Sequence, residues 1–185
     1  MYEVGDFVFY GDMGVCRVEN ISEQSMRGGD EDQLYYTLSP LSEKCVVYTP
    51  VKNTKVFMRS VISKDEAQEL IDRIPTIQAR AYHSKAIKDL TRHYEASLKS
   101  YDCADLIELT MSIYAKKLEA QEQKRKLGSV DEKFMKRAED LLFGELSVAL
   151  GVEKDDVAEY IVAKMNAAQR QSEVCDHTQS LEKRA

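Results

Sequence analysis

The amino-acid pattern changes once along the chain, at Ser63, and this change restricts the possible folds. Before it, short runs rich in β-branched and aromatic residues are separated by turn residues, which is typical of strands. After it, apolar residues recur at spacings of three and four, as on one face of a helix. The predicted strands are residues 7–10, 15–18, 33–38, 45–48 and 55–58. Five strands within about 55 residues suit a small barrel or curled sheet, because closure protects the edges of so short a sheet. We therefore predict an α+β protein, with a small five-stranded β-barrel followed by an all-α helical domain.

Capping residues mark where the first helices begin and end. Ser63 followed by Glu66 is a capping-box pattern, and Pro75 ends the short helix that it opens. Asp102 is expected to cap a long helix that stops before Gly128.

Two more helices are expected after this one. Ser129 with Glu132 predicts another capping box, for a helix that closes at Gly151. Asp155 or Asp156 then caps a last helix. The predicted organisation is a β domain at residues 1–62, a helical domain at residues 63–168 and a polar, disordered tail at residues 169–185.

The segment from Ala79 to Tyr101 joins an acidic front to a locally basic back. Its apolar residues form one helical stripe, made of Ile87, Leu90, Tyr94 and Leu98. The cations that accompany the stripe are Lys85, Lys88, Arg92, His93 and Lys99. Two interpretations are open: a solvated helix that packs on its neighbours, or a helix that presents cations and an apolar residue to nucleic acid.

The net charge is −6, so for nucleic-acid binding the distribution of charge matters more than its sum. Residues 80–137 carry 13 Lys and Arg against 9 Asp and Glu, whereas the segments on both sides are acidic. Any affinity for DNA should therefore be modest and need a partner. A second group of cations consists of Lys116, Lys117, Lys124, Arg125 and Lys126. These cations either contact phosphate or complement the negative C-terminus of the preceding helix.

Nothing in the sequence indicates a membrane or secreted protein. No apolar run approaches the roughly 18 residues that span a bilayer, and no charged start leads into an apolar signal core. We expect a cytoplasmic location. The cysteines, which are Cys16, Cys45, Cys103 and Cys175, form no CxxC pair and have no histidine nearby. We therefore expect reduced thiols and no zinc site.

No motif for catalysis is present. The sequence lacks the P-loop pattern, the glycine pattern of dinucleotide-binding strands, HExxH and GxSxG. His93 and Cys103 lie ten residues apart with no enforced geometry, so they do not indicate a catalytic pair. We expect no enzyme activity, no cofactor, no metal and no small-molecule substrate, and we infer that the chain works by binding other macromolecules.

Several short motifs follow one another over most of the chain. In the front half they are Val4-Gly5-Asp6-x-Val8-x-Tyr10, Gly14-Val15-x-Arg17-Val18, Leu34-Tyr35-Tyr36 and Val47-x-x-Pro50. In the back half they are Tyr94-x-x-x-Leu98 and Ala138-Glu139-x-Leu141-Leu142-x-Gly144-Glu145-Leu146. Their order over residues 2–166 resembles the CarD/CdnL family, small bacterial transcription regulators that bind RNA polymerase at promoters. The front half alone is also similar to the polymerase-interacting domain of transcription-repair coupling factors.

The resemblance implies a Tudor-like or SH3-like front barrel that docks on the RNA polymerase β subunit. Family members can present arginine near the positions of Gln24 and Tyr48, and Arg27 is a cation in the same loop as Gln24. Aromatic anchors are expected on the neighbouring strands of Tyr36 and Tyr48. The predicted polymerase-binding residues are Gln24, Arg27, Tyr36 and Tyr48.

The resemblance also implies a helical domain that contacts promoter DNA, where the family places a tryptophan wedge at the upstream edge of the forming bubble. This chain has no tryptophan, and the wedge position aligns with Leu90, which is either an apolar wedge or a core residue. Arg92 and His93 fall where family members often carry two cations. The predicted DNA-binding residues are Lys85, Lys88, Leu90, Arg92, His93, Lys116, Lys117, Lys124 and Arg125.

Two hypotheses for the function follow. In the first, the chain is a monomeric CarD-type regulator that binds the β subunit and contacts promoter DNA weakly, in a polymerase-dependent way, to modulate open-complex formation. In the second, it is an adaptor whose barrel binds polymerase or another protein and whose helices contact a second protein. Only the first hypothesis predicts a salt-dependent affinity for DNA.

Overall fold

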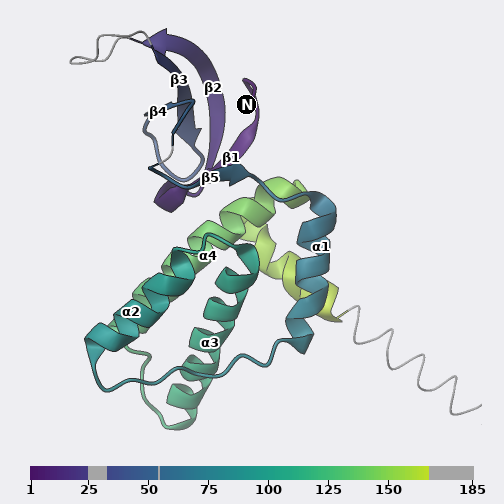
Figure 1. Cartoon of the computed structure of the whole chain (residues 1–185). Helices are drawn as coiled ribbons and strands as arrows, with labels where there is room; N and C mark the ends of the chain where they lie inside the picture. The colour runs from purple at the N-terminus through teal and green to yellow at the C-terminus, as the bar shows by residue number, and fades with distance from the viewer. Residues whose placement is uncertain (25–32, 54, 167–185) are drawn as a thin grey trace, which may run out of the picture.

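The computed structural model describes residues 1–24, 33–53 and 55–166. The tail predicted at residues 169–185 lies outside these ranges. A five-stranded antiparallel sheet forms the front of the chain and helices form the rest (Figure 1). This arrangement confirms the predicted α+β fold, with a barrel-like sheet followed by a helical part.

The sheet has the strand order β4-β3-β2-β1-β5, and every neighbouring pair is antiparallel. The strands are β1 (Phe7–Tyr10), β2 (Val15–Gln24), β3 (Gln33–Pro40), β4 (Val47–Pro50) and β5 (Met58–Ser60). A register shift between Val18 and Asn20 interrupts the β2–β3 pairing, and such irregularities bend and twist a strand. The sheet is strongly curved, and β4 and β5 are its edges (Figure 1).

The last two strands begin later than the sequence pattern predicts. The side chain of Asn53 explains this for β5, because its Oδ1 accepts from the backbone N–H of Lys55 at 2.8 Å. Its Nδ2 donates to the carbonyl oxygen of Val56 at 3.0 Å. These local bonds hold the segment in a turn and compete with strand pairing, so β5 starts only at Met58.

The two faces of the sheet contribute to two hydrophobic cores. One core lies inside the curved sheet and consists of Val8, Tyr10, Cys16, Val18, Tyr36 and Leu38. From the other face, Phe9 and Val15 enter the core of the helical part. The sheet and the helices therefore share buried apolar surface, which resists their separation.

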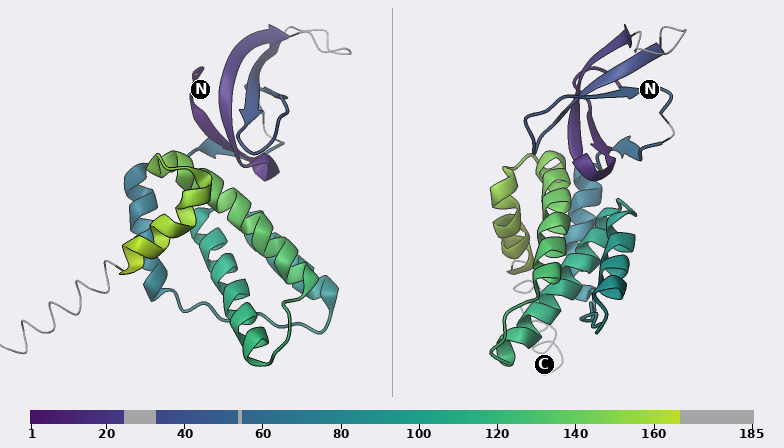
Figure 2. Two further views of the ribbon diagram at one scale, coloured as in Figure 1. Left: turned by 180° about the vertical axis from the view of Figure 1, so that it is seen from behind. Right: turned by 90° about the vertical axis from the view of Figure 1, so that its left-hand side faces the viewer.

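The helices follow the sheet in chain order. They are α1 (Lys64–Arg73), α2 (Ile87–Leu98), α3 (Cys103–Glu122), α4 (Ser129–Leu150) and a helical segment at residues 157–166, with short 3-10 turns η1 (Gly11–Met13), η2 (Ile74–Thr76) and η3 (Lys154–Asp156). α4 is the central helix, because it contacts α1, α2, α3 and β2. The views in Figure 2 show that the loop between α3 and α4 lies at the end of the helical part farthest from the sheet.

Three of the predicted helix boundaries are confirmed. Ser63 and Glu66 form a complete capping box at the start of α1, and the carboxylate of Asp102 accepts from the N–H of Ala104 at the start of α3. α4 ends at Gly151, whose φ of 69° is the left-handed conformation that glycine adopts without strain.

The capping box predicted at Ser129 is wrong. Ser129 is the first helical residue of α4. The N-cap is Gly128, which has no side chain to cap the helix. The backbone N–H of Glu132 donates to the carbonyl oxygen of Gly128 at 3.0 Å, so the helix begins one residue earlier than the pattern suggests. With this register Asp131 is buried, and it bonds to α2 and α3.

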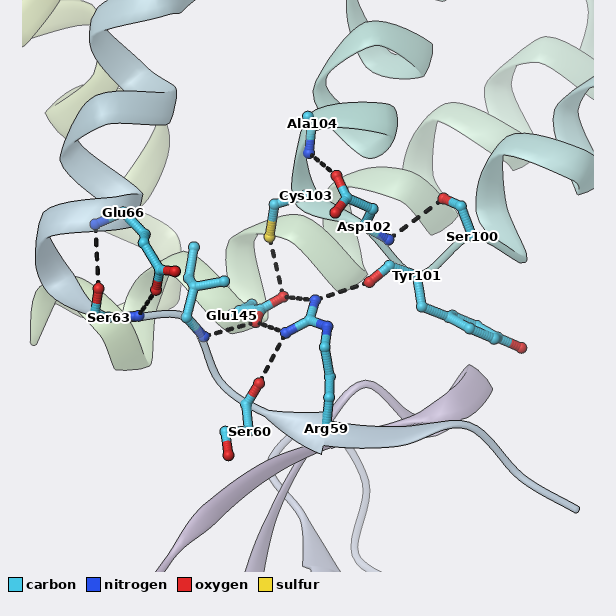
Figure 3. A network of polar contacts seen from close by, with 11 residues as sticks. Arg59, Ser60, Ser63, Glu66, Ser100, Tyr101, Asp102, Cys103, Ala104 and Glu145 are labelled. Atoms are coloured by element: carbon cyan, nitrogen blue, oxygen red, sulfur yellow. Dashed lines mark hydrogen bonds and ion pairs between the residues drawn. The ribbon is translucent and has the colours of Figure 1, made fainter. Parts of the chain in front are cut away.

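A network of charged and polar groups joins the sheet to the helices (Figure 3). Arg59 of β5 binds both carboxylate oxygens of Glu145 on α4, and it also donates to the carbonyl oxygen of Tyr101 at 2.8 Å. Glu145 is fully buried, and it further accepts from the N–H of Ile62 and from the thiol of Cys103, each at 3.0 Å. Donors from three separate segments of the chain therefore meet on one carboxylate.

The protonation states in this network follow from its geometry. Burial by itself lowers the pKa of Arg59, but the hydrogen bond and the charge of Glu145 outweigh this effect and raise it, so the guanidinium stays charged. Burial, and then the negative charge of Glu145, raises the pKa of the Cys103 thiol. Cys103 therefore remains protonated and donates its hydrogen to the carboxylate.

We predict that Arg59→Met lowers the free energy of unfolding by about 3–5 kcal/mol, because it leaves the charge of Glu145 buried without its partner. Arg92→Met is the matched control. It breaks the exposed pair between Arg92 and Asp89 and should cost less than about 1 kcal/mol. Urea titration of both variants measures the difference.

The double variant Arg59→Met/Glu145→Met removes both charges, so it should be considerably more stable than Arg59→Met alone. If Arg59→Met and Arg92→Met reduce the stability by the same small amount, the network does not hold the junction.

Candidate protein and nucleic-acid interfaces

The edge strand β4 presents one of the predicted polymerase-binding residues, Tyr48, at the surface. Tyr48 is 49% exposed, and Val46, just before the strand, is 56% exposed. β4 pairs with β3 along one side only, so the backbone groups on its other side are those of a sheet edge. A sheet edge of this kind is suited to pairing with a strand of another protein.

Of the other three predicted polymerase-binding residues, only Tyr36 can be placed, and it is not on this accessible surface. Tyr36 is only 2% exposed, and its hydroxyl accepts from the backbone N–H of Tyr2 at 2.9 Å. Its ring also packs against that of Tyr2, so Tyr36 is a core residue rather than an exposed anchor. Arg27 and the side chain of Gln24 lie outside the described residues.

Leu90 is expected to be either an exposed apolar wedge or a core residue, and in the structure it lies in the core. Its side chain is 6% exposed and packs in the same cluster as Tyr94 and Leu98. The exposed large apolar residue of α2 is Ile87, at the first position of the helix, with 67% of its surface accessible. The sequence placed both on one apolar stripe, but only Leu90 is covered by other side chains.

Arg92 and His93, which align with two cations of the family, have partners within their own region. Arg92 forms an exposed ion pair with Asp89 at 2.9 Å. His93 stacks on the ring of Tyr82, with 3.8 Å between the ring centroids. Both residues are exposed, and 81% of the Arg92 side chain is accessible.

Lys116, one of the predicted DNA-binding residues, is mostly covered and paired with an acid. Its ammonium group lies 2.7 Å from the Oδ1 of Asp131, and only 15% of its side chain is exposed. The hydroxyl of Tyr94 donates to the same carboxylate oxygen at 2.7 Å. Burial, followed by this hydrogen bond, raises the pKa of Tyr94, so the phenol stays neutral and serves as a donor.

Lys117 is also partly covered, but the cations beyond α3 are exposed. Lys117 is half-buried. Burial raises the pKa of Glu139 on α4, and the positive charge of Lys117 opposes this increase. Lys124, Arg125 and Lys126 are exposed in the loop after α3. Within the described part of the chain, the side chains of these three residues have no hydrogen-bond or ion-pair partner.

Contacts along α3 bring the start of α2 towards this loop. Ser112 donates to the carbonyl oxygen of Arg80 at 2.7 Å, and His83 lies 2.8 Å from the carboxylate of Glu119. A cavity of about 190 Å³ is lined by His83 together with Arg125 and other residues of the loop. We call this surface the distal basic end; its exposed cations are Lys85, Lys88, Lys124, Arg125 and Lys126.

The described residues provide no cluster of His, Cys, Asp or Glu side chains that could bind a metal ion. In the same part of the chain, no helix has the length and apolar character needed to cross a membrane.

Residues 2–62 match the family model described as the CarD-like/TRCF RID domain. The resemblance stated from the sequence motifs is thus confirmed for this part of the chain, which contains all five strands. The match relates the sheet to a domain that interacts with RNA polymerase and is a protein-interaction domain rather than a catalytic one. It ends where the helical part begins.

We predict that Leu90→Ala lowers the free energy of unfolding by about 2–5 kcal/mol, because it leaves a cavity in the core. Leu90→Trp should also destabilise the fold, by about 1–3 kcal/mol, because the larger ring does not fit the same space. Ile87→Ala is the control on the same helix, and its effect should be within about 0.5 kcal/mol. Denaturant titration measures the stability of all three variants. If Leu90→Ala is as stable as the unaltered chain, Leu90 is not a core residue.

Proposed function

We propose that this chain is a non-enzymatic transcription regulator that binds the β subunit of RNA polymerase through its sheet and contacts promoter DNA through the distal basic end. The observation that carries the proposal is the match of residues 2–62 to a polymerase-interacting domain. The position of the α3–α4 loop at the far end of the helical part adds to it, because two partners can then be contacted at once (Figure 2).

On the polymerase side, we propose β4 as the docking edge. Strand addition at an edge supplies main-chain hydrogen bonds, and exposed aromatic residues next to it supply apolar contact area. Tyr48 and Val46 provide this area beside β4. The inner face of the sheet is closed by its own core, so it is not available to a partner.

On the DNA side, the exposed cations of the distal basic end are the proposed phosphate contacts. Ile87 lies between Lys85 and Lys88 in the chain and is a large, exposed apolar side chain. An aliphatic side chain in this position can press against a base step, although it has no aromatic face for stacking. Through this contact the chain would modulate open-complex formation.

A protein-interaction adaptor is the second candidate, and a specific observation favours it. Asp89, Glu119 and Glu122 lie among the cations of the distal basic end, and two of these acids already pair with Arg92 and His83. Interspersed acids weaken the attraction for phosphate. In this case the same surface would contact a second protein.

We predict that Tyr48→Ala weakens binding of the full chain to the purified β subunit about tenfold, which corresponds to about 1.4 kcal/mol. Tyr114→Ala is the matched control, because Tyr114 on α3 is 50% exposed but lies outside the sheet. Fluorescence anisotropy of the labelled chain measures both affinities. If the two variants bind the β subunit with equal affinity, β4 is not the docking edge.

We predict that Lys124→Glu/Arg125→Glu weakens the association with duplex DNA equally for all sequences. It should reduce the slope of log K against log salt by about 0.9 for each phosphate that the variant no longer neutralises. Lys64→Glu/Arg73→Glu, on the exposed surface of α1, makes the same change in net charge and should leave the slope unaltered. If the unaltered chain has no salt-dependent affinity for DNA, alone or with polymerase, the adaptor function is the correct one.

A further inference from the structure

A groove with a cavity of about 520 Å³ lies between the sheet and α4. The turn before β2 and the loop after β3 form one wall, and α4 with the loop after it forms the other. Its volume is within the range of protein binding sites, and junctions between domains are a common place for them. It is separate from the proposed contacts at β4 and at the distal basic end.

Gly144 lies in the floor of this groove, inside the 22-residue helix α4. A glycine within a helix is destabilising relative to alanine. Apart from the backbone of α4 itself and the two adjoining residues, no described atom lies within 4 Å of the position that a Cβ of Gly144 would occupy. Packing within the described chain therefore does not require a glycine at position 144.

Gly14, in the opposite wall, differs from Gly144. Its φ of 69° and the Leu141 side chain, 3.2 Å from the position that a Cβ would occupy, both explain why a glycine is needed there. The open space above Gly144 is suited to close approach by another backbone.

The walls of the groove combine apolar and acidic groups. Val15 and Leu141 contribute buried apolar surface, and Leu41 at the rim is 53% exposed. The two cations of the walls are already engaged, because Lys154 pairs with Asp140 at 2.8 Å and Arg137 donates to the carbonyl oxygen of Asp12.

Two carboxylates of the groove remain without a cationic partner in the described structure. Glu43 comes from the sheet side and Glu153 from the helical side, and both residues are exposed. Glu43 has only a distant thiol contact, to Cys45 at 4.0 Å. These acids repel phosphate and attract a cation, so charge complementarity favours a basic protein segment over nucleic acid.

We propose that this groove docks an extended segment of a partner protein in which an apolar side chain lies next to a basic one. The apolar side chain packs mainly on Leu41, beside the small accessible parts of Val15 and Leu141. The segment's backbone passes over Gly144, and the basic group reaches Glu43 and Glu153. The walls are held in place by the network around Arg59 and Glu145, so the groove exists before its partner binds. The groove and its occupant are independent of the proposed function.

The test uses the ¹⁵N-labelled full chain and a capped peptide of the composition Ala-Leu-Arg-Leu-Ala, followed by NMR. We expect saturable shifts of the amides of Gly14, Leu41, Gly144 and Ser147. The same peptide with glutamate in place of arginine should bind at least about fivefold more weakly. Glu43→Gln and Glu153→Gln, which are exposed and leave the core intact, should each weaken binding of the basic peptide about two- to fivefold.

Gly144→Leu fills the groove with a good helix former and should abolish the shifts without lowering the denaturant midpoint. Ala163→Leu is the matched control, because it adds the same side chain at an exposed helical position outside the groove and should bind the peptide normally. The proposal is overturned if the basic peptide gives no saturable shifts, if the acidic peptide binds equally well, if binding survives Gly144→Leu, or if duplex DNA shifts the same amides.

Discussion

The ion pair between Arg59 and Glu145 is the constraint on which the arrangement of this molecule depends. Moving a carboxylate out of water costs several kcal/mol, and the cost is offset only when every lone pair finds a partner. Glu145 meets this condition because Arg59, Ile62 and Cys103 all donate to it. These donors come from β5, from the segment that leads to α1, and from the start of α3. The three can satisfy one carboxylate only in a single relative position, so the pair fixes the sheet on the helical part.

This fixed arrangement sets the relative positions of β4, the distal basic end and the groove over Gly144. The edge strand β4 belongs to the sheet, while the exposed cations beyond α3 lie at the far end of the helical part (Figure 1). Between them the groove over Gly144 has an acidic rim. The exposed cations of the distal basic end and the unpaired carboxylates of the groove therefore lie at different places on a chain whose net charge is −6. A polyanion would be attracted at the first place and repelled at the second.

Apart from the capping box at Ser129, the sequence predicted the features that depend on neighbours in the chain and missed those that depend on distant residues. The change from strands to helices, the capping box at Ser63 and the αL end at Gly151 are local, and they are correct. The partners Arg59 and Glu145 are 86 residues apart, and no local sequence pattern predicts such an ion pair. The sequence predicts Lys116 as a surface cation, but in the structure it pairs with Asp131, 15 residues later in the chain. Periodicity placed Leu90 and Ile87 on one stripe, but the coverage of that stripe by other helices decides that the first is buried and the second exposed.

The withdrawal of Lys116 and Leu90 from the exposed surface leaves few groups for DNA, yet a weak contact is sufficient if the sheet is held by polymerase. Non-specific binding of proteins to DNA has dissociation constants of about 10⁻⁴–10⁻⁶ M at physiological salt. A second site tethered beside its target experiences an effective concentration in the millimolar range when the geometry allows both contacts. That concentration exceeds even the weakest of these constants. The rigid junction at Arg59 and Glu145 then matters as much as the cations, because a fixed spacing either brings the distal basic end to the duplex or keeps it away.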